Sequence, residues 1–193
     1  MGIPKLKTQK YSYADYLTWP DDERWELIDG VAYDMSPAPF VKHQEIVGNV
    51  FFVLKTFLKG KKCTPYISPF DIRFPEMSIN DDTIYTVVQP DVLVYCDPSR
   101  VDKRGGIGAP DLVVEVLSES TRMKDLTSKL LLFQRSVVKE YWVIDPETDI
   151  LYQYILDKNG MYYPPNEIKN GGILKCSIFP LEFDTTDIYP PVI

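Results

Sequence analysis

One apolar segment carries a single carboxylate at its centre, and this combination limits the folds that the chain can adopt. The segment runs Ala109-Pro110-Asp111-Leu112-Val113-Val114-Glu115-Val116-Leu117-Ser118. A continuous run of β-branched and aliphatic residues is typical of a strand that is buried on both faces of a sheet. Helices cover both faces of such sheets in α/β proteins. The segment therefore predicts a central strand of an α/β sheet, with Glu115 inside the core and Asp111 at the strand entry.

The carboxylate of Glu115 needs a partner, because burial of an unpaired charge is costly. It could be a core residue paired with a basic side chain, or it could bind a cation. A second segment, Gln89-Pro90-Asp91-Val92-Leu93-Val94-Tyr95, places Asp91 at the head of another apolar strand, although Pro-Asp pairs are also common in turns. If the two strands are neighbours, Asp91 and Glu115 could bind one magnesium ion, which prefers oxygen ligands.

The segment after Glu115 predicts a helix from Thr121 to Val137, because apolar residues recur at spacings of three and four. Glu115 lies about 10 Å before the end of its strand. Residues 121–129 of the returning helix span about 12 Å. This geometry would bring Lys129 level with Glu115. Alternatively, Lys129 forms an i,i+4 pair with Asp125 on a solvated face, and Arg122 lies on the same stripe.

Two further residues complete the candidate site. Glu26 lies in Arg24-Trp25-Glu26-Leu27-Ile28, where apolar residues again flank an acid. His43 is the only histidine and falls in the first turn of a predicted helix, so multi-histidine zinc sites are excluded, although a lone histidine is more often structural or solvated. The chain has no GxSxG nucleophile elbow, no Walker loop, and no GxGxxG motif between a strand and a helix.

The other periodic segments predict an α/β sandwich on a mixed central sheet, in the order helix, strand, strand, strand, helix, strand, with antiparallel β additions at both ends. The expected helices are Ser12–Trp19, capped by Ser12, and Val41–Leu58, which the proline-bounded Ser36–Pro39 opens and Gly60 ends. The expected strands are Trp25–Ile28 and Val31–Met35 around a turn at Asp29-Gly30, then Tyr66–Phe74, Asp91–Tyr95, Asp111–Leu117 and Glu140–Ile144, followed by Ile150–Leu156, Met161–Tyr163 and Ile173–Ile178.

Neither an internal repeat nor a linker interrupts this pattern, so residues 1–193 are expected to form a single domain.

Two long connections, Pro75–Gln89 and Asp97–Ala109, are rich in Gly, Asp, Asn and Ser, and long loops of this kind are often functional. The apolar β segments after residue 150 could form a homodimer interface or complete the core.

The charge balance and the cysteines bear on partners and location. The chain has 28 acidic and 21 basic residues, a net charge of -7, which argues against binding nucleic acid by bulk electrostatics. A local basic patch beside an acidic metal site remains compatible with this balance. Three cysteines without a CxxC motif predict a reducing compartment and no disulfide. Because no apolar stretch is long enough for a bilayer and residues 1–10 lack a signal core, we expect a cytoplasmic protein without membrane contact.

Taken in order, these segments resemble the PD-(D/E)XK nuclease superfamily. The resemblance is closer to the large bacterial family of restriction-endonuclease-like proteins long catalogued as a domain of unknown function. It spans about residues 24–156 and rests on the following segments: Glu26-Leu27-Ile28-Asp29-Gly30, Met35 to Pro39 with His43-Gln44, Gln89-Pro90-Asp91-Val92, Ala109 to Ser118, Ser120-Thr121-Arg122 with Asp125 and Lys129, and Glu140 to Pro146.

The resemblance implies a restriction-endonuclease-like core and a role for each candidate residue. Asp91 and Glu115 would hold Mg²⁺ or Mn²⁺, helped by Glu26 and the carbonyl of Val116. Lys129 would orient the attacking water or offset charge on the phosphate, and His43 would line the same pocket. The chain departs from the superfamily's strand motif, because Leu117 occupies the usual lysine position two residues after Glu115. The close family shares this feature, with the lysine supplied from the following helix, where Lys129 lies.

The leading interpretation is therefore a metal-dependent endonuclease that hydrolyses DNA phosphodiester bonds. Contacts to the DNA backbone are expected from a set of basic residues that could equally be ordinary solvated surface: Arg100, Lys103, Arg104, Arg122 and Lys124. A catalytically inactive binding or regulatory protein with the nuclease fold is the alternative, favoured by the charge of -7 and by Leu117. A third possibility is a hydrolase of small phosphate esters.

Overall fold

A computed structural model of the chain describes residues 10–20, 22–35 and 40–190. Its helices are α1 (Tyr13–Tyr16), α2 (Val41–Leu58), α3 (Arg122–Lys124) and α4 (Leu130–Arg135), with a π-helical turn, η3 (Asp125–Lys129), between the last two and short 3₁₀ turns η1 (Asp81–Thr83), η2 (Pro98–Arg100) and η4 (Thr185–Asp187). Its strands are β1 (Trp25–Ile28), β2 (Val31–Asp34), β3 (Thr64–Ile67), β4 (Ile72–Arg73), β5 (Val87–Val88), β6 (Val92–Tyr95), β7 (Val101–Asp102), β8 (Gly105–Ile107), β9 (Leu112–Val116), β10 (Glu140–Asp145), β11 (Ile150–Ile155), β12 (Asn166–Lys169), β13 (Ile173–Lys175) and β14 (Glu182–Asp184).

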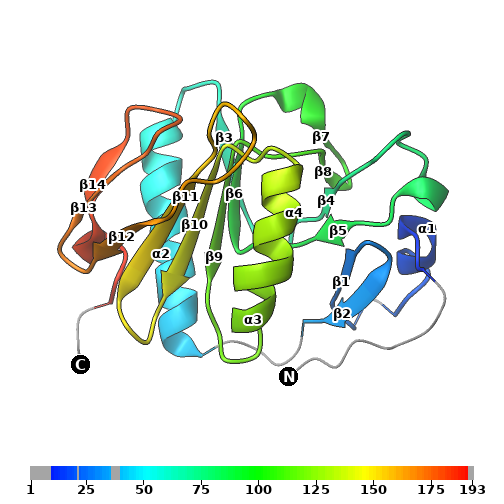
Figure 1. The fold of residues 1–193 in the computed structure, drawn as a ribbon, viewed down its shortest axis with the longest axis horizontal. Coiled ribbons are helices and arrows are strands. Elements are labelled where there is room, and N and C mark those ends of the chain that lie inside the picture. Colours follow the sequence, from blue (N-terminus) through cyan, green and yellow to red (C-terminus); the bar gives the residue numbers. More distant parts are fainter. Residues whose placement is uncertain (1–9, 21, 36–39, 191–193) are drawn as a thin grey trace.

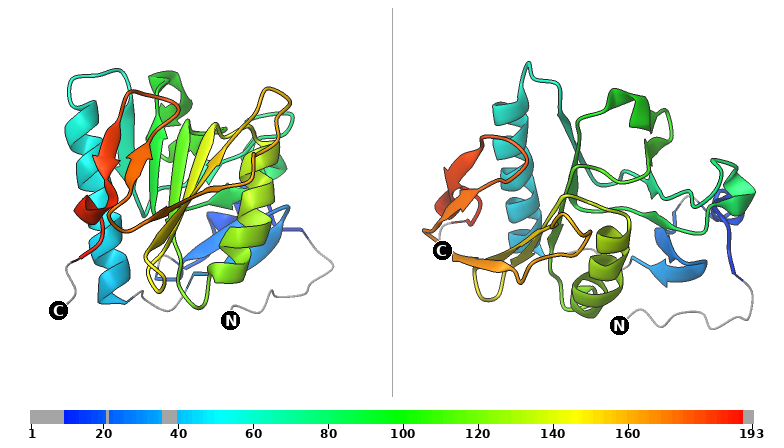
Figure 2. Two further views of the ribbon diagram at one scale, coloured as in Figure 1. Left: turned by 60° about the vertical axis from the view of Figure 1, so that its left-hand side comes forward. Right: turned by 45° about the horizontal axis from the view of Figure 1, so that its top comes forward.

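The central sheet has the strand order β12-β11-β10-β9-β6-β3 and lies between two helical layers (Figures 1 and 2). β9 and β10 are parallel, with Glu115 opposite Val143, and the helical segment from α3 to α4 connects them. All other neighbours in this sheet are antiparallel. Val114 and Val116 pack on the side of α2, whereas Val113 and Leu117 pack on the side of α4. The predicted α/β architecture on a mixed sheet is therefore confirmed.

Elements with a strong local signal lie where the sequence predicts them. α2 has the predicted bounds, and Ser12 caps α1 through a capping box with Asp15. The turn of the β1–β2 hairpin contains Asp29 and Gly30, both with positive φ, as expected for a tight two-residue hairpin. The predicted helix start at Ser36–Pro39 lies outside the described residues.

One predicted strand, Tyr66–Phe74, is wrong. The chain instead forms β3 in the central sheet and β4 in a second sheet, and Ser68-Pro69 lies between them. Pro69 has no backbone N–H to donate, so it cannot continue the ladder of a central sheet. The predicted strand Met161–Tyr163 is also wrong, because Tyr162 forms only an isolated bridge with Leu156.

The two segments that the sequence predicts to be long loops, Pro75–Gln89 and Asp97–Ala109, contain short strands. They contain β5, β7 and β8, which join β4 and the β1–β2 hairpin in a second six-stranded sheet of order β2-β1-β5-β4-β8-β7. The glycines that suggested a loop are required for close packing. A Cβ on Gly105 would lie 2.2 Å from the carbonyl oxygen of Asp71, and one on Gly106 would lie 2.3 Å from the hydroxyl of Tyr95. This second sheet brings β1 to the edge of the candidate site.

The apolar segments near the C-terminus complete the core. Leu174 and Phe183, from the β13–β14 hairpin, are buried together with Ile188 in the cluster that contains the apolar face of α2. Figure 2 shows this hairpin beside α2. The homodimer stays a prediction. None of the helices in the described part of the chain combines the length and the hydrophobicity needed to span a membrane.

The bonding of the cysteines also differs from the prediction. Cys63 and Cys96 form a disulfide, with Cα atoms 3.9 Å apart, and Cys176 is free. The two residues lie at adjoining ends of the antiparallel strands β3 and β6, where Thr64 is opposite Tyr95. Their separation of 33 residues in the sequence conceals this proximity. The prediction that the chain has no disulfide is therefore wrong.

Reduction of this disulfide is expected to lower the free energy of unfolding by roughly 3 kcal/mol, because cross-linking a loop of this size restricts the unfolded chain. Under denaturing, non-reducing conditions, thiol titration should find one reactive group per chain, and after reduction three. Urea unfolding of the oxidised and reduced protein measures the difference. Cys176→Ser, which leaves the bond intact, is the control. Three thiols before reduction would show that the bond does not form.

Candidate active site

A cavity of about 140 Å³ lies where β6, β9, α2 and the α3–η3 segment meet. Four of the five predicted site residues, Asp91, Glu115, Lys129 and His43, line it. We call it the site cavity. The other lining residues are Arg24, Met35, Gln44, Val47, Ile67, Ser68, Gln89, Val116, Ser118, Ser120, Thr121, Lys124 and Asp125.

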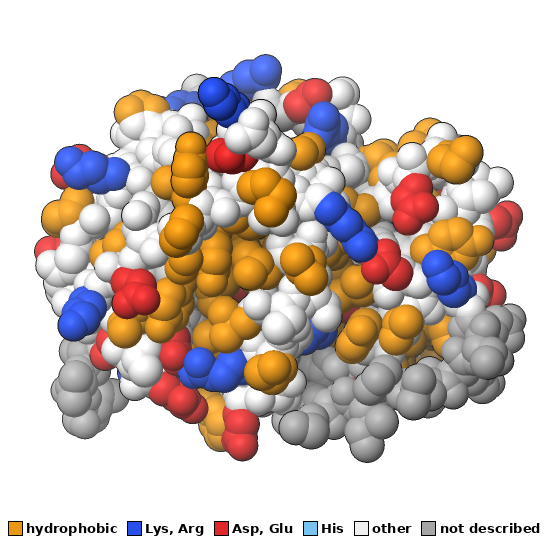
Figure 3. All heavy atoms as spheres, in the orientation of Figure 1, with side chains coloured by type: hydrophobic (Ala, Val, Ile, Leu, Met, Phe, Trp, Pro, Cys, Tyr) orange, Lys and Arg blue, Asp and Glu red, His pale blue; other side chains and the backbone are white. Residues whose placement is uncertain are grey.

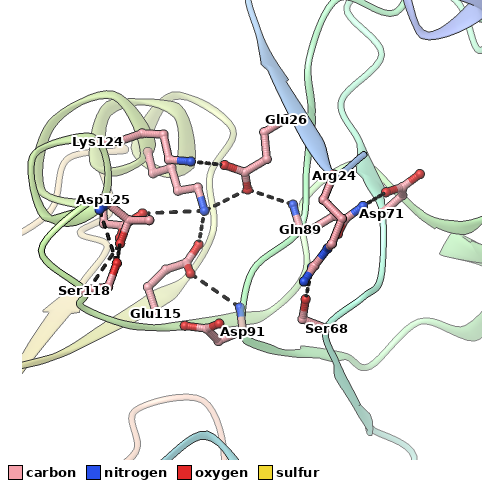
Figure 4. A network of polar contacts seen from close by, with 12 residues as sticks. Arg24, Glu26, Ser68, Asp71, Gln89, Asp91, Glu115, Ser118, Lys124 and Asp125 are labelled. Carbon is pink, nitrogen blue, oxygen red and sulfur yellow. Dashed lines mark hydrogen bonds and ion pairs between the residues drawn. The ribbon is translucent and has the colours of Figure 1, made fainter. Parts of the chain in front are cut away.

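Lys129 occupies the centre of a buried ionic cluster. Figure 4 labels the other members of the cluster: Glu26, Glu115, Lys124 and Asp125. The Nζ of Lys129 lies 2.6 Å from Glu115 Oε1, 2.8 Å from Glu26 Oε1 and 3.5 Å from Asp125 Oδ1. The predicted proximity of Lys129 to Glu115 is confirmed, and the solvated-face alternative is wrong, since only 2% of Lys129 is exposed. Burial lowers the pKa of Lys129, but the three carboxylates outweigh it and raise that pKa well above its usual value.

The local backbone contributes to this arrangement. Residues Asp125–Lys129 form a π-helical turn inside an otherwise α-helical segment. Both Asp125 and Lys129 are buried, and each lines the site cavity. π-helical turns often occur at functional sites. The sequence spacing predicts an ordinary i,i+4 pair of Asp125 and Lys129 on an α-helix. The wider π-helical turn is a feature that only the structure reveals.

Glu115 lies at the inner wall of the site cavity and is 4% exposed. Its Oε1 contacts Lys129, and its Oε2 accepts a long hydrogen bond, 3.4 Å, from the backbone N of Asp91. Burial raises the pKa of Glu115 well above its usual value, and the carboxylates of Asp125, Asp91 and Glu26 add to this effect against Lys129. The ionised form of Glu115 therefore needs additional positive charge.

Glu26 is fully buried and does not line the site cavity. Its Oε1 accepts a hydrogen bond of 2.9 Å from the backbone N of Gln89 and contacts Lys129, while its Oε2 lies 2.5 Å from Lys124 Nζ. Burial raises the pKa of Glu26, but the two lysines outweigh it and lower that pKa to about 2. Both oxygens are thus engaged with protein cations, and Glu26 positions Lys129 rather than facing the cavity.

Asp91 and His43 form the more open wall of the cavity. The Asp91 side chain is 20% exposed, and its Oδ2 accepts a hydrogen bond of 2.8 Å from the backbone N of Val116. His43 Nε2 lies 3.4 Å from the same oxygen, and its Nδ1 is buried without a hydrogen-bond partner among the described residues. Burial lowers the pKa of His43, but the contact with Asp91 outweighs it, so this pKa is raised.

The basic residues predicted to contact DNA are mostly engaged elsewhere. Lys124 lines the site cavity, whereas Arg104 pairs with Asp81 and Arg122 pairs with Asp145. Arg100 donates to the carbonyl of Ala109 and, like Lys103, does not line the cavity. On the face shown in Figure 3, lysine and arginine side chains are dispersed among acidic ones. Of this set, only Lys124 lines the described cavity, and the basic rim stays a prediction.

Sequence reasoning missed Gln89, which connects the parts of the site. Its backbone N donates to Glu26, its Nε2 donates to Asp71 Oδ1 at 2.8 Å, and its Oε1 accepts from Arg24 Nη2 at 2.8 Å. The only local signal was its place before Pro90-Asp91. Nothing in that position indicates that an amide binds partners from three different segments.

A divalent cation fits this site in donor chemistry. Four carboxylates (Glu26, Asp91, Glu115 and Asp125) lie around two ammonium groups (Lys124 and Lys129), and Arg24 lines the same cavity outside this cluster. In the described part of the chain, no three Asp, Glu, His or Cys side chains are placed to hold an ion by themselves. Magnesium usually binds one or two carboxylates and completes its shell with water and phosphate oxygens. Asp91 and Glu115 fit that pattern.

Comparison with known proteins gives three findings. Residues 13–187 match the model of a family described as "Uma2: Putative restriction endonuclease". A relative from Synechocystis sp., named "Uncharacterized protein slr1290", is 28% identical over 149 residues, which cover 76% of this chain and 74% of that protein. The crystal structure of "a putative nuclease belonging to DUF820 from Anabaena variabilis" matches with a TM-score of 0.71 and 20% identity, covering 92% of this chain and 96% of that one. This last likeness supports the fold.

Proposed function

Because the chain belongs to the Uma2 family, described as "Putative restriction endonuclease", we propose that it is a metal-dependent endonuclease that hydrolyses phosphodiester bonds of DNA. One observation carries the proposal. Two carboxylates from neighbouring strands and a lysine from the following helix, Asp91, Glu115 and Lys129, line the same small cavity. Oxygen ligands for a divalent cation beside a fixed positive charge are what phosphodiester hydrolysis requires.

Each residue has a distinct task in this proposal. Asp91 and Glu115 would hold Mg²⁺ or Mn²⁺, which when bound polarises a phosphate and lowers the pKa of a water ligand. Lys129 keeps its proton, because Glu26, Glu115 and Asp125 raise its pKa. It therefore donates hydrogen bonds to charge that develops on the phosphate and does not act as the base. Glu26 and Lys124 hold Lys129 in place.

His43 has a supporting task. Its contact with Asp91 Oδ2 at 3.4 Å orients that carboxylate toward the cavity, together with the backbone N of Val116. The Val116 carbonyl belongs to a residue that lines the cavity, so it remains a proposed additional oxygen ligand.

The purified protein is expected to nick and linearise supercoiled plasmid when Mg²⁺ or Mn²⁺ is added, and to leave it intact in EDTA. The reason is that the two proposed metal ligands, Asp91 and Glu115, line the site cavity, and a divalent cation bound there would supply the activation of phosphate and water. Gel electrophoresis of plasmid and of single-stranded DNA measures the reaction. Restored cleavage after excess Mn²⁺ is the control for EDTA damage. Equal cleavage with and without metal would contradict the proposal.

A catalytically inactive nucleic-acid-binding protein is the second candidate. Two observations favour it: Lys129 is already paired with carboxylates, and the net charge of the chain is -7. This candidate predicts DNA binding without cleavage in any metal. A hydrolase of small phosphate esters would instead cleave a chromogenic phosphodiester and leave plasmid intact.

A further inference from the structure

Arg24 differs from the other cations that line the site cavity. Lys129 and Lys124 are paired with buried carboxylates, whereas Arg24 is exposed and its Nη2 donates to two neutral acceptors, Ser68 Oγ and Gln89 Oε1, each at 2.8 Å. Of the described residues that line the cavity, it is the only lysine or arginine without an acidic partner. Its positive charge is therefore available to a ligand.

The orientation of this guanidinium is held by a buried amide. Gln89 Nε2 donates to Asp71 Oδ1 at 2.8 Å and to the hydroxyl of Tyr16 at 3.0 Å, which turns Oε1 toward Arg24. Figure 4 shows Arg24 and Ser68 on one side of Asp91 and the Glu115 cluster on the other. Because the backbone N of Gln89 also binds Glu26, the same residue sets Arg24 relative to the ionic cluster.

The contacts of Arg24 leave part of its donor set unused. Both hydrogen bonds use Nη2, and Nη1 and Nε have no bond to another described residue. A guanidinium presents its N–H groups in a planar fork that matches the oxygens of a phosphate. The two neutral partners fix the group without neutralising it, which is the arrangement expected of a preorganised anion site.

We propose that Arg24 binds a phosphate of the DNA backbone that flanks the scissile one at Asp91 and Glu115. This inference rests on the proposed function and adds a substrate contact to it. Arg24 anchors the strand across the mouth of the site cavity, and Gln89 acts as the positioning residue for it. Arg24 thus supplies one phosphate contact at the cavity of a chain whose net charge is -7.

The test measures DNA binding separately from cleavage. Fluorescence anisotropy of a labelled duplex, with Ca²⁺ in place of Mg²⁺, gives the binding constant over a range of salt concentrations. Arg24→Gln is expected to reduce the slope of log K against log salt by about 0.9, the value for one lost phosphate contact. It should also weaken binding several-fold. Arg24→Lys, which keeps the charge, should retain most of the slope.

Arg135→Gln is the control, because Arg135 is also exposed but pairs with Asp29 and does not line the site cavity. It should leave the slope unchanged. Gln89→Ala, which keeps the backbone N–H to Glu26, should raise KM for plasmid cleavage more than it lowers kcat. If the wild-type protein binds and cleaves DNA but Arg24→Gln has the wild-type slope and KM, this inference is overturned alone. If the wild-type protein neither binds nor cleaves DNA, the proposed function is overturned as well.

Discussion

Glu115→Gln is expected to reduce DNA cleavage by more than about 100-fold, the scale reported for removing one electrostatic group from a preorganised site. The substitution removes one of the two carboxylates proposed to hold the metal and keeps the size of the side chain. Initial rates of plasmid nicking in Mg²⁺ and Mn²⁺ measure the loss. Cleavage that persists at the wild-type rate would point to a contaminating nuclease and contradict the proposed function.

The free energy of unfolding shows whether Glu115→Gln loses cleavage through its site or through its fold. Because burial and neighbouring carboxylates raise the pKa of Glu115, its ionised form is unfavourable in the folded protein at high pH. We therefore expect Glu115→Gln not to lower the free energy of unfolding at pH 8. Asp111→Asn is the matched control. Asp111 precedes the same strand and pairs with Lys139 at 2.6 Å, but it does not line the site cavity, so cleavage should be unchanged.

Lys129→Met is expected to lower the free energy of unfolding by about 3–5 kcal/mol at pH 8, as when one partner is removed from a buried ion pair. The variant leaves Glu26, Glu115 and Asp125 without their central cation. The pKa of Glu26, which the lysines lower in the wild-type protein, then rises, and the pKa values of Glu115 and Asp125, which burial already raises, rise further. Such groups destabilise the fold when they are ionised, so the deficit should shrink as the pH falls and they become protonated.

Urea unfolding of the wild-type protein and the variant at pH 8 and pH 5 measures this prediction, and plasmid cleavage by Lys129→Met should be lost in parallel. Lys139→Met is the control, because Lys139 pairs with Asp111 at the surface and exposed pairs contribute less than about 1 kcal/mol. A deficit of the same size at both pH values would show that Lys129 acts through packing. A deficit below that of the control would show that the cluster is not ionised.

Much of the candidate site could be predicted from local sequence. The Leu112–Leu117 run places Glu115 in the core, because a strand that is buried on both faces is apolar at consecutive positions. The proximity of Lys129 to Glu115 could also be predicted, because the helix runs back along the strand. The rise per residue of strand and helix gives the two lengths, and these bring Lys129 level with Glu115. The bounds of α2 followed from helical periodicity and from Gly60 after its end.

Other features depend on contacts between distant segments. Four of the six strands of the second sheet, β4, β5, β7 and β8, have only two or three residues, too few to give a signal of their own. Gly105 and Gly106 suggested a loop, although they serve close packing. The Cys63–Cys96 disulfide follows from the pairing of β3 with β6. Neither could be predicted, because strand register and order are set by pairing across the fold and not by neighbours in the chain.

The sequence by itself determined which side chains had to be reconciled with a buried environment: Glu26, Glu115 and the acid at the head of β6, Asp91. Only the tertiary structure decided their tasks. It turned Glu26 away from the cavity onto two lysines, left Asp91 partly exposed, and used Gln89 to hold Arg24. The physical reason is that the burial of a side chain can be predicted from the apolar residues of its own strand. The partner of a buried charge comes from other segments, which meet only when the sheets pack.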